Sequence, residues 1–228
     1  MPTVRNVYAN IGWKGYDGKR VIYPVCVRSP AQQGRNLTAS FTALSERIKE
    51  IDLVLIDTLD RYNFDGDADL CRQNGRDWLE KSMPLIERAF DVKSYTIWDD
   101  VLSDPTYIRR KEKIINAYYS NATVRDMIDR NAMYFVHAKR ARGETFDEQK
   151  LFENSRDYMI EEYAGTAVYG QELGYLPEAY WGIYVGNQTF FADHTGDQSL
   201  VLPETLPISV SRLSPPFAGE QPARKLAA

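Results

Sequence analysis

A continuous apolar run in the first quarter of the chain, Asp52–Asp57 (DLVLID), constrains the fold more than any other feature. Runs of this kind are typical of strands that are buried on both faces of a parallel sheet. A similar run, Arg20–Val27 (RVIYPVCV), precedes it, and a third, Ser94–Trp98 (SYTIW), follows it. Two amphipathic stretches, Leu37–Glu50 and Asp67–Phe90 with approximate ends, separate the three runs. This order predicts right-handed βαβ crossovers and a doubly wound sheet.

The rest of the sequence predicts further helices and then a return to strands. Asn36 is expected to cap the first helix, because asparagine side chains accept hydrogen bonds from the N–H groups of a first turn. No repeat or linker divides the sequence, so we expect one α/β domain over residues 1–212 and a disordered tail over residues 213–228. The further helices are expected at Pro105–Tyr119, Thr123–Arg142 and Phe146–Leu173, and the further strands at Tyr180–Val185 and Thr189–Ala192.

The composition is that of an ordinary globular protein, with 43% apolar and 26% charged residues among 228. No apolar run approaches the roughly 20 residues that a membrane span needs, and the first residues lack the pattern of a signal peptide. The two cysteines, Cys26 and Cys71, form no CxxC pair and are too few for a disulfide framework. We therefore expect a cytoplasmic protein without a membrane partner.

The charge distribution leaves a nucleic-acid partner open. The net charge of −4 argues mildly against one, because nucleic-acid-binding domains are usually basic. Positive charge nevertheless gathers in the middle third of the chain, at Arg109, Arg110, Lys111 and Lys113. Runs of this kind are most often solvated helix faces, so charge alone decides nothing.

Several motifs of nucleotide and metal chemistry are missing from the sequence. No GxGxxG follows a predicted strand, no GxxxxGK[ST] phosphate loop is present, and the HIGH and KMSKS signatures of class I aminoacyl-tRNA synthetases are absent. The two histidines, His137 and His194, do not have the spacing of a metal-ligand pair. We therefore expect a protein that needs no ATP, no other cofactor and no metal.

A few polar residues lie where an active site could form. Tyr158 and Glu162 are four residues apart in a predicted helix, so they share one face, and Tyr169 extends that face. On spacing alone, tyrosines packed into a core explain this pattern better than catalysis does. Ser29 directly follows a predicted strand, at the carboxyl end where open α/β sheets bind ligands. Tyr184 lies at or near the end of a later strand.

Taken in order, these residues resemble the pattern of the cyclodipeptide synthases, enzymes that make a 2,5-diketopiperazine from two aminoacyl-tRNAs. That family has a nucleophilic serine after the first core strand, a later helix with Tyr-x-x-x-Glu, and a further tyrosine beyond a Gly/Pro turn. The corresponding elements here are Ser29, the YMIEE sequence at residues 158–162, and the GYLP turn at residues 174–177 that leads to Tyr184. The resemblance spans roughly residues 20–184. It implies a single Rossmann-like domain with a mostly parallel sheet flanked by helices, similar to the catalytic domain of class I tyrosyl- and tryptophanyl-tRNA synthetases.

The sequence departs from the family's pattern beside the serine. The family's Gly-Asn is replaced by Val27-Arg28, which leaves Thr38 and Ser40 near the next helix as alternative nucleophiles. A divergent branch explains this departure, and the fungal branch whose members use arginine is one candidate. A pocket for a cationic amino acid should contain an acidic residue, and Asp57, at the end of its strand, is the candidate for that role.

The resemblance also implies roles for the individual residues. Ser29 would attack the first aminoacyl ester, because an aminoacyl-tRNA is already activated and needs neither ATP nor metal. Glu162 and Tyr158 would hold the α-ammonium group by charge-assisted hydrogen bonds, and Tyr184 would relay a proton or donate to an oxyanion. Tyr169 would be a further substrate-binding residue. The basic run at residues 109–113 would contact tRNA phosphates in a monomer or homodimer.

Two other interpretations stay open at this point. One is a serine hydrolase that uses Ser29 and His194, although the G-x-S-x-G elbow of such enzymes is absent. The other is a non-catalytic tRNA- or nucleotide-binding module with the same fold.

Overall fold

A parallel sheet organises the computed structural model, as the three apolar runs predict. The structure describes residues 4–6, 20–29, 32–46, 48–63, 66–169, 174–175, 189–202 and 208–210. The sheet has the strand order β4-β3-β2-β5, and each neighbouring pair is parallel. A separate two-stranded sheet pairs β1 with β6 antiparallel. The strands are β1 (Val4–Asn6), β2 (Arg20–Val25), β3 (Glu50–Leu55), β4 (Asp91–Ile97), β5 (Gly174–Tyr175) and β6 (Ile208–Val210).

Helices connect the strands and form the second half of the described chain. The two crossovers of the sheet are helical, so the predicted α/β class is confirmed. The α-helices are α1 (Gly34–Ser45), α2 (Ala68–Ala89), α3 (Trp98–Leu102), α4 (Pro105–Ser120), α5 (Ala122–Ala141), α6 (Glu148–Thr166) and α7 (Phe190–Thr195), and the 3-10 turns are η3 (Thr58–Asn63), η4 (Ala167–Tyr169) and η5 (Gln198–Leu200). Within the described ranges, no helix is long and apolar enough to cross a membrane.

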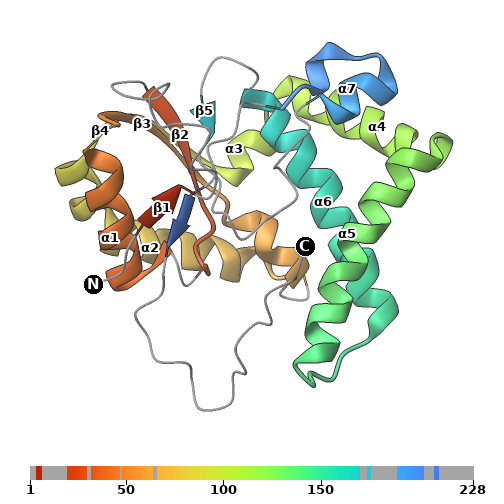
Figure 1. Cartoon of the computed structure of the whole chain (residues 1–228), viewed down its shortest axis with the longest axis horizontal. Coiled ribbons are helices and arrows are strands. Elements are labelled where there is room, and N and C mark those ends of the chain that lie inside the picture. Colours follow the sequence, from red (N-terminus) through yellow and green to blue (C-terminus); the bar gives the residue numbers. More distant parts are fainter. Residues whose placement is uncertain are drawn as a thin grey trace.

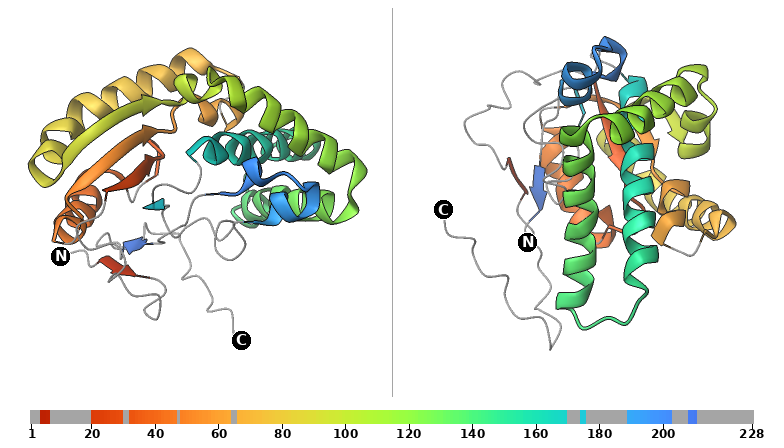
Figure 2. Two further views of the ribbon diagram at one scale, coloured as in Figure 1. Left: turned by 90° about the horizontal axis from the view of Figure 1, so that it is seen from above. Right: turned by 90° about the vertical axis from the view of Figure 1, so that its right-hand side faces the viewer.

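Two apolar cores lie on opposite faces of the sheet (Figures 1 and 2). Successive side chains of a strand point to opposite faces, so neighbouring residues of β2 belong to different cores. Val21 and Tyr23 pack with α1 and α2, whereas Ile22 packs with the core formed by α4, α5 and α6. β2 and β3 are thus buried on both sides, which accounts for their continuous apolar runs, whereas the edge strand β4 is mostly exposed.

Some predicted boundaries are wrong. The first helix begins at Gly34 with Gln33 as its N-cap, so Asn36 lies in the first turn and does not cap it. The helix also ends at Ser45, because Glu50 already pairs with Arg20 in the sheet. The predicted strand Thr189–Ala192 is instead the start of α7.

The remaining differences concern the C-terminal part of the chain. The helix predicted at Phe146–Leu173 is α6, which starts at Glu148 and ends at Thr166, followed by a 3-10 turn. The predicted strand Tyr180–Val185 lies outside the described residues. Phe191, which lies in the predicted strand Thr189–Ala192, is 2% exposed and packs on Tyr163 with ring centroids 4.7 Å apart. A four-residue apolar pattern is too short to distinguish a strand from one buried helical turn.

Candidate active site

The carboxyl ends of β2, β3 and β4 meet at one edge of the sheet. Val25 is level with Leu55, and Leu55 with Ile97, so the segments that follow these residues leave the sheet side by side. They carry the turn with Ser29, the buried Asp57 and the start of α3 at Trp98. This edge is where open α/β sheets bind ligands, and it is therefore the candidate site.

The turn that carries Ser29 is fixed by a buried glutamine. Gln32 is 4% exposed; its Nε2 donates to the carbonyl of Pro24 (2.8 Å), and its Oε1 accepts from the N–H of Cys26 (2.6 Å). The indole Nε1 of Trp78 on α2 donates to the main-chain carbonyl of Gln32 (2.8 Å). The N–H of Ser29 closes the turn on the Cys26 carbonyl (2.8 Å). Ser29 is therefore held at the sheet edge on a rigid, hydrogen-bonded turn.

The two alternative nucleophiles lie on α1 and are used differently. The Thr38 hydroxyl donates to the Gly34 carbonyl (3.2 Å), and the Ser40 hydroxyl donates to the Asn36 carbonyl (3.0 Å). Ser40 is also 1% exposed. Both hydroxyls thus bond to the backbone of their own helix.

Tyr158 and Glu162 share the buried side of α6, with exposed fractions of 6% and 5%. The Tyr158 ring meets the ring of Tyr62 on η3 edge to face, with centroids 6.4 Å apart. This contact sets α6 against the segment that follows β3. The two candidate residues thus lie on a helix that packs beside the sheet edge carrying Ser29 and Asp57 (Figure 1).

The neighbouring Glu161, which the sequence did not single out, anchors α6 to this edge. Its carboxylate is 1% exposed and accepts two hydrogen bonds from the Arg61 guanidinium, at 2.8 Å and 2.6 Å. It also accepts from Trp98 Nε1 (3.1 Å), from the Tyr62 hydroxyl (3.1 Å) and from Lys111 Nζ (3.2 Å). Glu161 and Glu162 are adjacent in the sequence, and nothing in the sequence indicates that Glu161 has these partners.

The environment of Glu161 makes this residue a poor candidate for binding an ammonium group. Burial by itself would raise the pKa of Glu161, but the bonds and charge of Arg61, together with Lys111 and Trp98, hold this pKa below its ordinary value. Its charge is thus already balanced by two cations of the protein. A substrate ammonium would gain little there, so the amine-binding prediction stays with Glu162.

Two further carboxylates, Asp57 and Asp60, are buried at the end of β3. They are 3% and 5% exposed, and burial raises the pKa of each. Asp57 accepts a hydrogen bond from the main-chain N–H of Trp98 (3.2 Å). Asp60 Oδ2 has no hydrogen-bond partner among the residues that the structure describes, which is costly for a buried carboxylate. The charge of Arg28, the residue before Ser29, partly opposes this rise in the pKa of Asp60.

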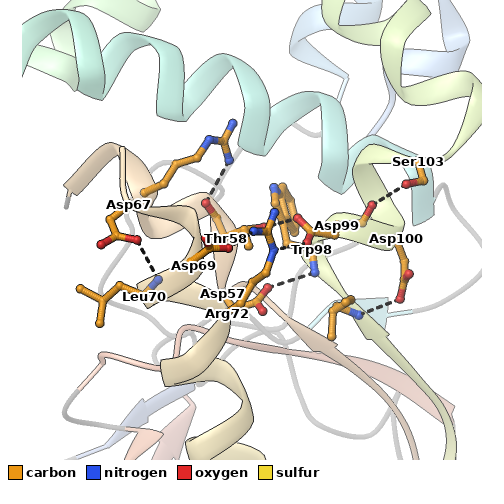
Figure 3. A network of polar contacts seen from close by, with 12 residues as sticks. Asp57, Thr58, Asp67, Asp69, Leu70, Arg72, Trp98, Asp99, Asp100 and Ser103 are labelled. Atoms are coloured by element: carbon orange, nitrogen blue, oxygen red, sulfur yellow. Dashed lines mark hydrogen bonds and ion pairs between the residues drawn. The ribbon is translucent and has the colours of Figure 1, made fainter. Parts of the chain in front are cut away.

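A polar network joins these strand ends to α2 (Figure 3). The Asp99 carboxylate accepts from the Thr58 hydroxyl (2.9 Å) and from Arg72 Nε (2.7 Å). Because Thr58 follows β3, Asp99 follows β4 and Arg72 belongs to α2, the network fixes three elements around Asp57. Nothing in it brings together metal ligands: the described residues contain no group of three His, Cys, Asp or Glu suited to a metal ion.

The basic run lies on α4, and most of its members have partners within the protein. Arg110 Nε donates to the Ser199 carbonyl (3.0 Å), Lys111 pairs with Glu161, and Lys113 pairs with Asp197. The Arg109 side chain is exposed, and no ion pair to it is recorded within the described ranges. The prediction of phosphate contacts therefore concerns Arg109 most directly.

The remaining candidates are distributed as follows. Tyr184 lies outside the described residues, and Tyr169 closes the 3-10 turn after α6, although its side chain is not described. His194 is on α7, where its Nδ1 lies 2.8 Å from the Phe190 carbonyl. α7 packs against α4 and η5. This arrangement gives no support to a Ser29–His194 pair.

No protein-family model and no curated protein sequence matches the chain. The similar proteins described next were found by comparing structures. A cyclodipeptide synthase from Fluoribacter dumoffii superposes with a TM-score of 0.76 at 14% identity, covering 93% of this chain and 100% of that chain. A cyclodipeptide synthase from Candidatus Glomeribacter gigasporarum, solved bound to Phe-tRNA, gives a TM-score of 0.55 at 16% identity over 90% of this chain and 94% of that chain.

A third solved structure connects this fold to the synthetases. A Mycobacterium tuberculosis protein, whose structure relates cyclodipeptide synthetases to type I tRNA synthetases, gives a TM-score of 0.57 at 12% identity. The superposition covers 92% of this chain and 93% of that chain. The chain has the fold of the cyclodipeptide synthases, which is related to that of class I tRNA synthetases.

Proposed function

We propose that this protein is a tRNA-dependent cyclodipeptide synthase, an aminoacyltransferase that joins the amino acids of two aminoacyl-tRNAs into a 2,5-diketopiperazine. One observation carries the proposal beyond the fold. The turn with Ser29 and the helix with Tyr158 and Glu162 both lie at the carboxyl edge of the parallel sheet. A single catalytic domain over residues 1–212 would contain all of these groups.

The first step is an exchange of esters. The Ser29 hydroxyl attacks the carbonyl carbon of the first aminoacyl-tRNA, its proton passes to the departing ribose hydroxyl, and the aminoacyl group becomes an ester of Ser29. Bonds of nearly equal energy are exchanged, so the protein contributes positioning and proton transfer. The Gln32 bonds support this role because they hold the Ser29 turn in one conformation.

The second step forms the peptide bonds. Glu162 and Tyr158 hold the α-ammonium of the Ser29 ester, and Glu162 takes its proton so that the amine can attack the second aminoacyl-tRNA. The ester bond of that aminoacyl-tRNA breaks, and its tRNA leaves as the ribose hydroxyl with the transferred proton. Tyr184 relays a proton or donates to the oxyanion. The amine of the second residue then attacks the Ser29 ester, which releases the cyclic product and restores the serine hydroxyl.

We propose two aminoacyl-tRNAs as the substrates, and cytoplasm as the compartment, because charged tRNA is found there. The structure of the similar cyclodipeptide synthase bound to Phe-tRNA supports this substrate class. We further propose an arginine-using enzyme, with Asp57 and Tyr169 in substrate binding. The buried, unpartnered Asp60 oxygen beside Asp57 supports a cationic side chain, since a guanidinium would satisfy it. A monomer or homodimer would suffice.

The direct test supplies the purified protein with tRNAs charged with each amino acid in turn and looks for a diketopiperazine by mass. Arginyl-tRNA is expected to give a product, and the protein should carry an aminoacyl adduct that is lost in Ser29→Ala. Thr38→Ala serves as the matched control and should keep the adduct. Absence of any cyclic dipeptide from all aminoacyl-tRNAs would refute the function; products without arginine would refute only the specificity.

A further inference from the structure

Helix α4 carries an apolar stripe on its solvent side. Ile108, Ile115 and Tyr119 are spaced i, i+7 and i+11, so they lie along one side of the helix. Ile108 is 59% exposed, and Tyr119 is 69% exposed. Single apolar side chains at a surface are ordinary, but a row of them along one helix is typical of a surface that a partner covers. α4 packs against α6 and lies at the periphery of the molecule (Figures 1 and 2).

A pocket opens beside the Tyr119 end of this stripe, between α4, α6 and η3. Its apolar lining comes from Ile115, Tyr118 and Ile160, and Tyr119 contributes to the lining as well. The volume is about 180 Å³. Pockets for small-molecule ligands are larger, roughly 300–1,000 Å³, so this pocket is suited to a single large side chain.

The pocket is on the other side of α6 from the candidate catalytic residues. Arg156 and Ile160 line it, and each is two residues from Tyr158, which is about 200° around an α-helix. Ile160 is also two residues from Glu162. The pocket is therefore separate from the proposed amine-binding pair, and the reaction proposed above leaves it without a role.

The exposed ring of Tyr119 is held in place. It meets the ring of Tyr118 edge to face, with centroids 5.1 Å apart, and the Tyr118 hydroxyl donates to Asp129 Oδ1 on α5 (2.8 Å). A side chain that is already ordered loses little freedom on binding, and tyrosine is enriched at the centres of protein interfaces. Tyr119 is therefore suited to anchor a protein partner.

The charged groups of the pocket are balanced. Arg156 Nη2 pairs with Asp157 Oδ1 (2.8 Å), and Lys111 Nζ pairs with Glu161 Oε2 (3.2 Å). A nucleic-acid phosphate would have to compete with these carboxylates, so the pocket does not favour tRNA. A surface that carries both signs of charge can instead meet its own copy, because a two-fold axis can set the cations of one copy opposite the carboxylates of the other.

We infer that the stripe and the pocket together bind a second copy of this chain in a two-fold dimer. A two-fold interface uses the same surface on both subunits, so one surface must carry both a projecting group and the space that receives it. Here α4 presents an exposed ring directly beside a pocket for one ring. Tyr119 of each copy enters the pocket of the other, and Ile108 and Ile115 are covered where the two α4 helices cross.

Sedimentation equilibrium of the full-length protein, from micromolar to hundreds of micromolar, tests this inference. The wild type should pass from monomer to dimer as its concentration rises. Tyr119→Asp should weaken dimerisation by about tenfold or more, because it removes the anchoring ring and places a charge in an apolar contact. Tyr134→Asp makes the same change at a 72% exposed position on α5, outside the pocket lining, and is the matched control that should dimerise like the wild type.

Circular dichroism shows whether each variant is folded. Ile108→Asp, at the other exposed position of the stripe, should also weaken the dimer, and it replaces Tyr119→Asp if that variant does not fold.

The outcomes separate a second copy from other partners. A wild type that stays monomeric throughout would overturn the inference, as would a Tyr119→Asp dimer as tight as that of the wild type. Growth beyond the dimer would overturn it too, because it indicates a contact that a two-fold axis does not close. If Tyr119→Asp, but not Tyr134→Asp, loses tRNA binding and leaves association unchanged, the surface binds nucleic acid instead. None of these measurements uses aminoacyl transfer, so the inference goes beyond the proposed synthase and can stand or fall without it.

Discussion

Glu161 shows how much one residue contributes to the position of its neighbour. Its carboxylate joins three separate segments, through Arg61 on η3, Trp98 on α3 and Lys111 on α4. Glu162 follows it directly on α6, so the same bonds fix the main chain from which Glu162 extends. We therefore interpret Glu161 as a positioning residue for the amine-binding glutamate.

Replacing Glu161 by glutamine should destabilise the protein by about 3 kcal/mol at pH 7, because Arg61 and Lys111 would be left partly buried without their carboxylate. The folded-state pKa of Glu161 is depressed, so its stabilisation is present above the unfolded value of about 4.3 and is lost as the pH falls through the folded value. The gap between wild type and variant should thus narrow below about pH 4.

Chemical denaturation at pH 7 and at acid pH measures both quantities. Glu112→Gln, an exposed glutamate on α4, is the control and should be near neutral at either pH. A Glu161→Gln penalty that stays constant across this pH range would show that packing, and not the ion pair, stabilises α6.

At the scale of elements, α6 approaches α3 so closely that only a glycine fits between them. A Cβ at Gly165 would lie 2.5 Å from a ring carbon of Trp98, which is 0% exposed and has no room to turn. Alanine would favour the helix by about 1 kcal/mol, but overpacking a rigid core costs about 1–3 kcal/mol. We therefore expect the cost of overpacking to exceed the gain in helix propensity.

Gly165→Ala is therefore expected to lower the melting temperature and to shift Trp98, whose Nε1 donates to Glu161 (3.1 Å). Thermal unfolding measures the first effect, and the near-ultraviolet signal of the buried indole measures the second. Glu153→Ala, at an exposed position on the same helix, should leave both unchanged. A more stable Gly165→Ala variant would mean that α6 can move away from α3 without cost.

The elements also show what the sequence can reveal. Apolar runs located β2 and β3 within two residues, because burial on both faces of a sheet leaves a continuous pattern. The start of α1 was predicted wrongly because the side chains of Gln32 and Gln33 bond to the backbone of the preceding loop. Helix propensities do not include such contacts. The Glu161 network was missed for the same reason: its partners come from distant segments.

At the scale of the whole molecule, the net charge of −4 means that any tRNA contact relies on local groups of cations. Within the basic run, Lys113 pairs with Asp197, which lowers the pKa of that carboxyl to about 2, and Lys111 pairs with Glu161. Arg109 is the exposed member. The basic run at residues 109–113 therefore has less unpaired positive charge at the surface than its sequence suggests.

Arg109→Ala should therefore weaken tRNA binding and reduce the slope of log K against log salt by about 1, the loss expected for one phosphate contact. Filter binding over a salt series measures the slope. Arg130→Ala, which removes an exposed cation from α5, is the control. An equal loss in both variants would indicate a general effect of charge and no specific contact on α4.

The bond between Arg61 and Glu161 spans 100 positions of the sequence. Closing so long a loop costs chain entropy before the contacts of the finished fold compensate for it, and distant pairings of this kind slow folding. During synthesis, the Ser29 turn and η3 with Arg61 leave the ribosome well before α6. Helical structure can therefore form early. The candidate site at the carboxyl ends of the strands forms only after the two distant halves of the chain have docked. Catalytic competence should be the last property that a refolding molecule regains.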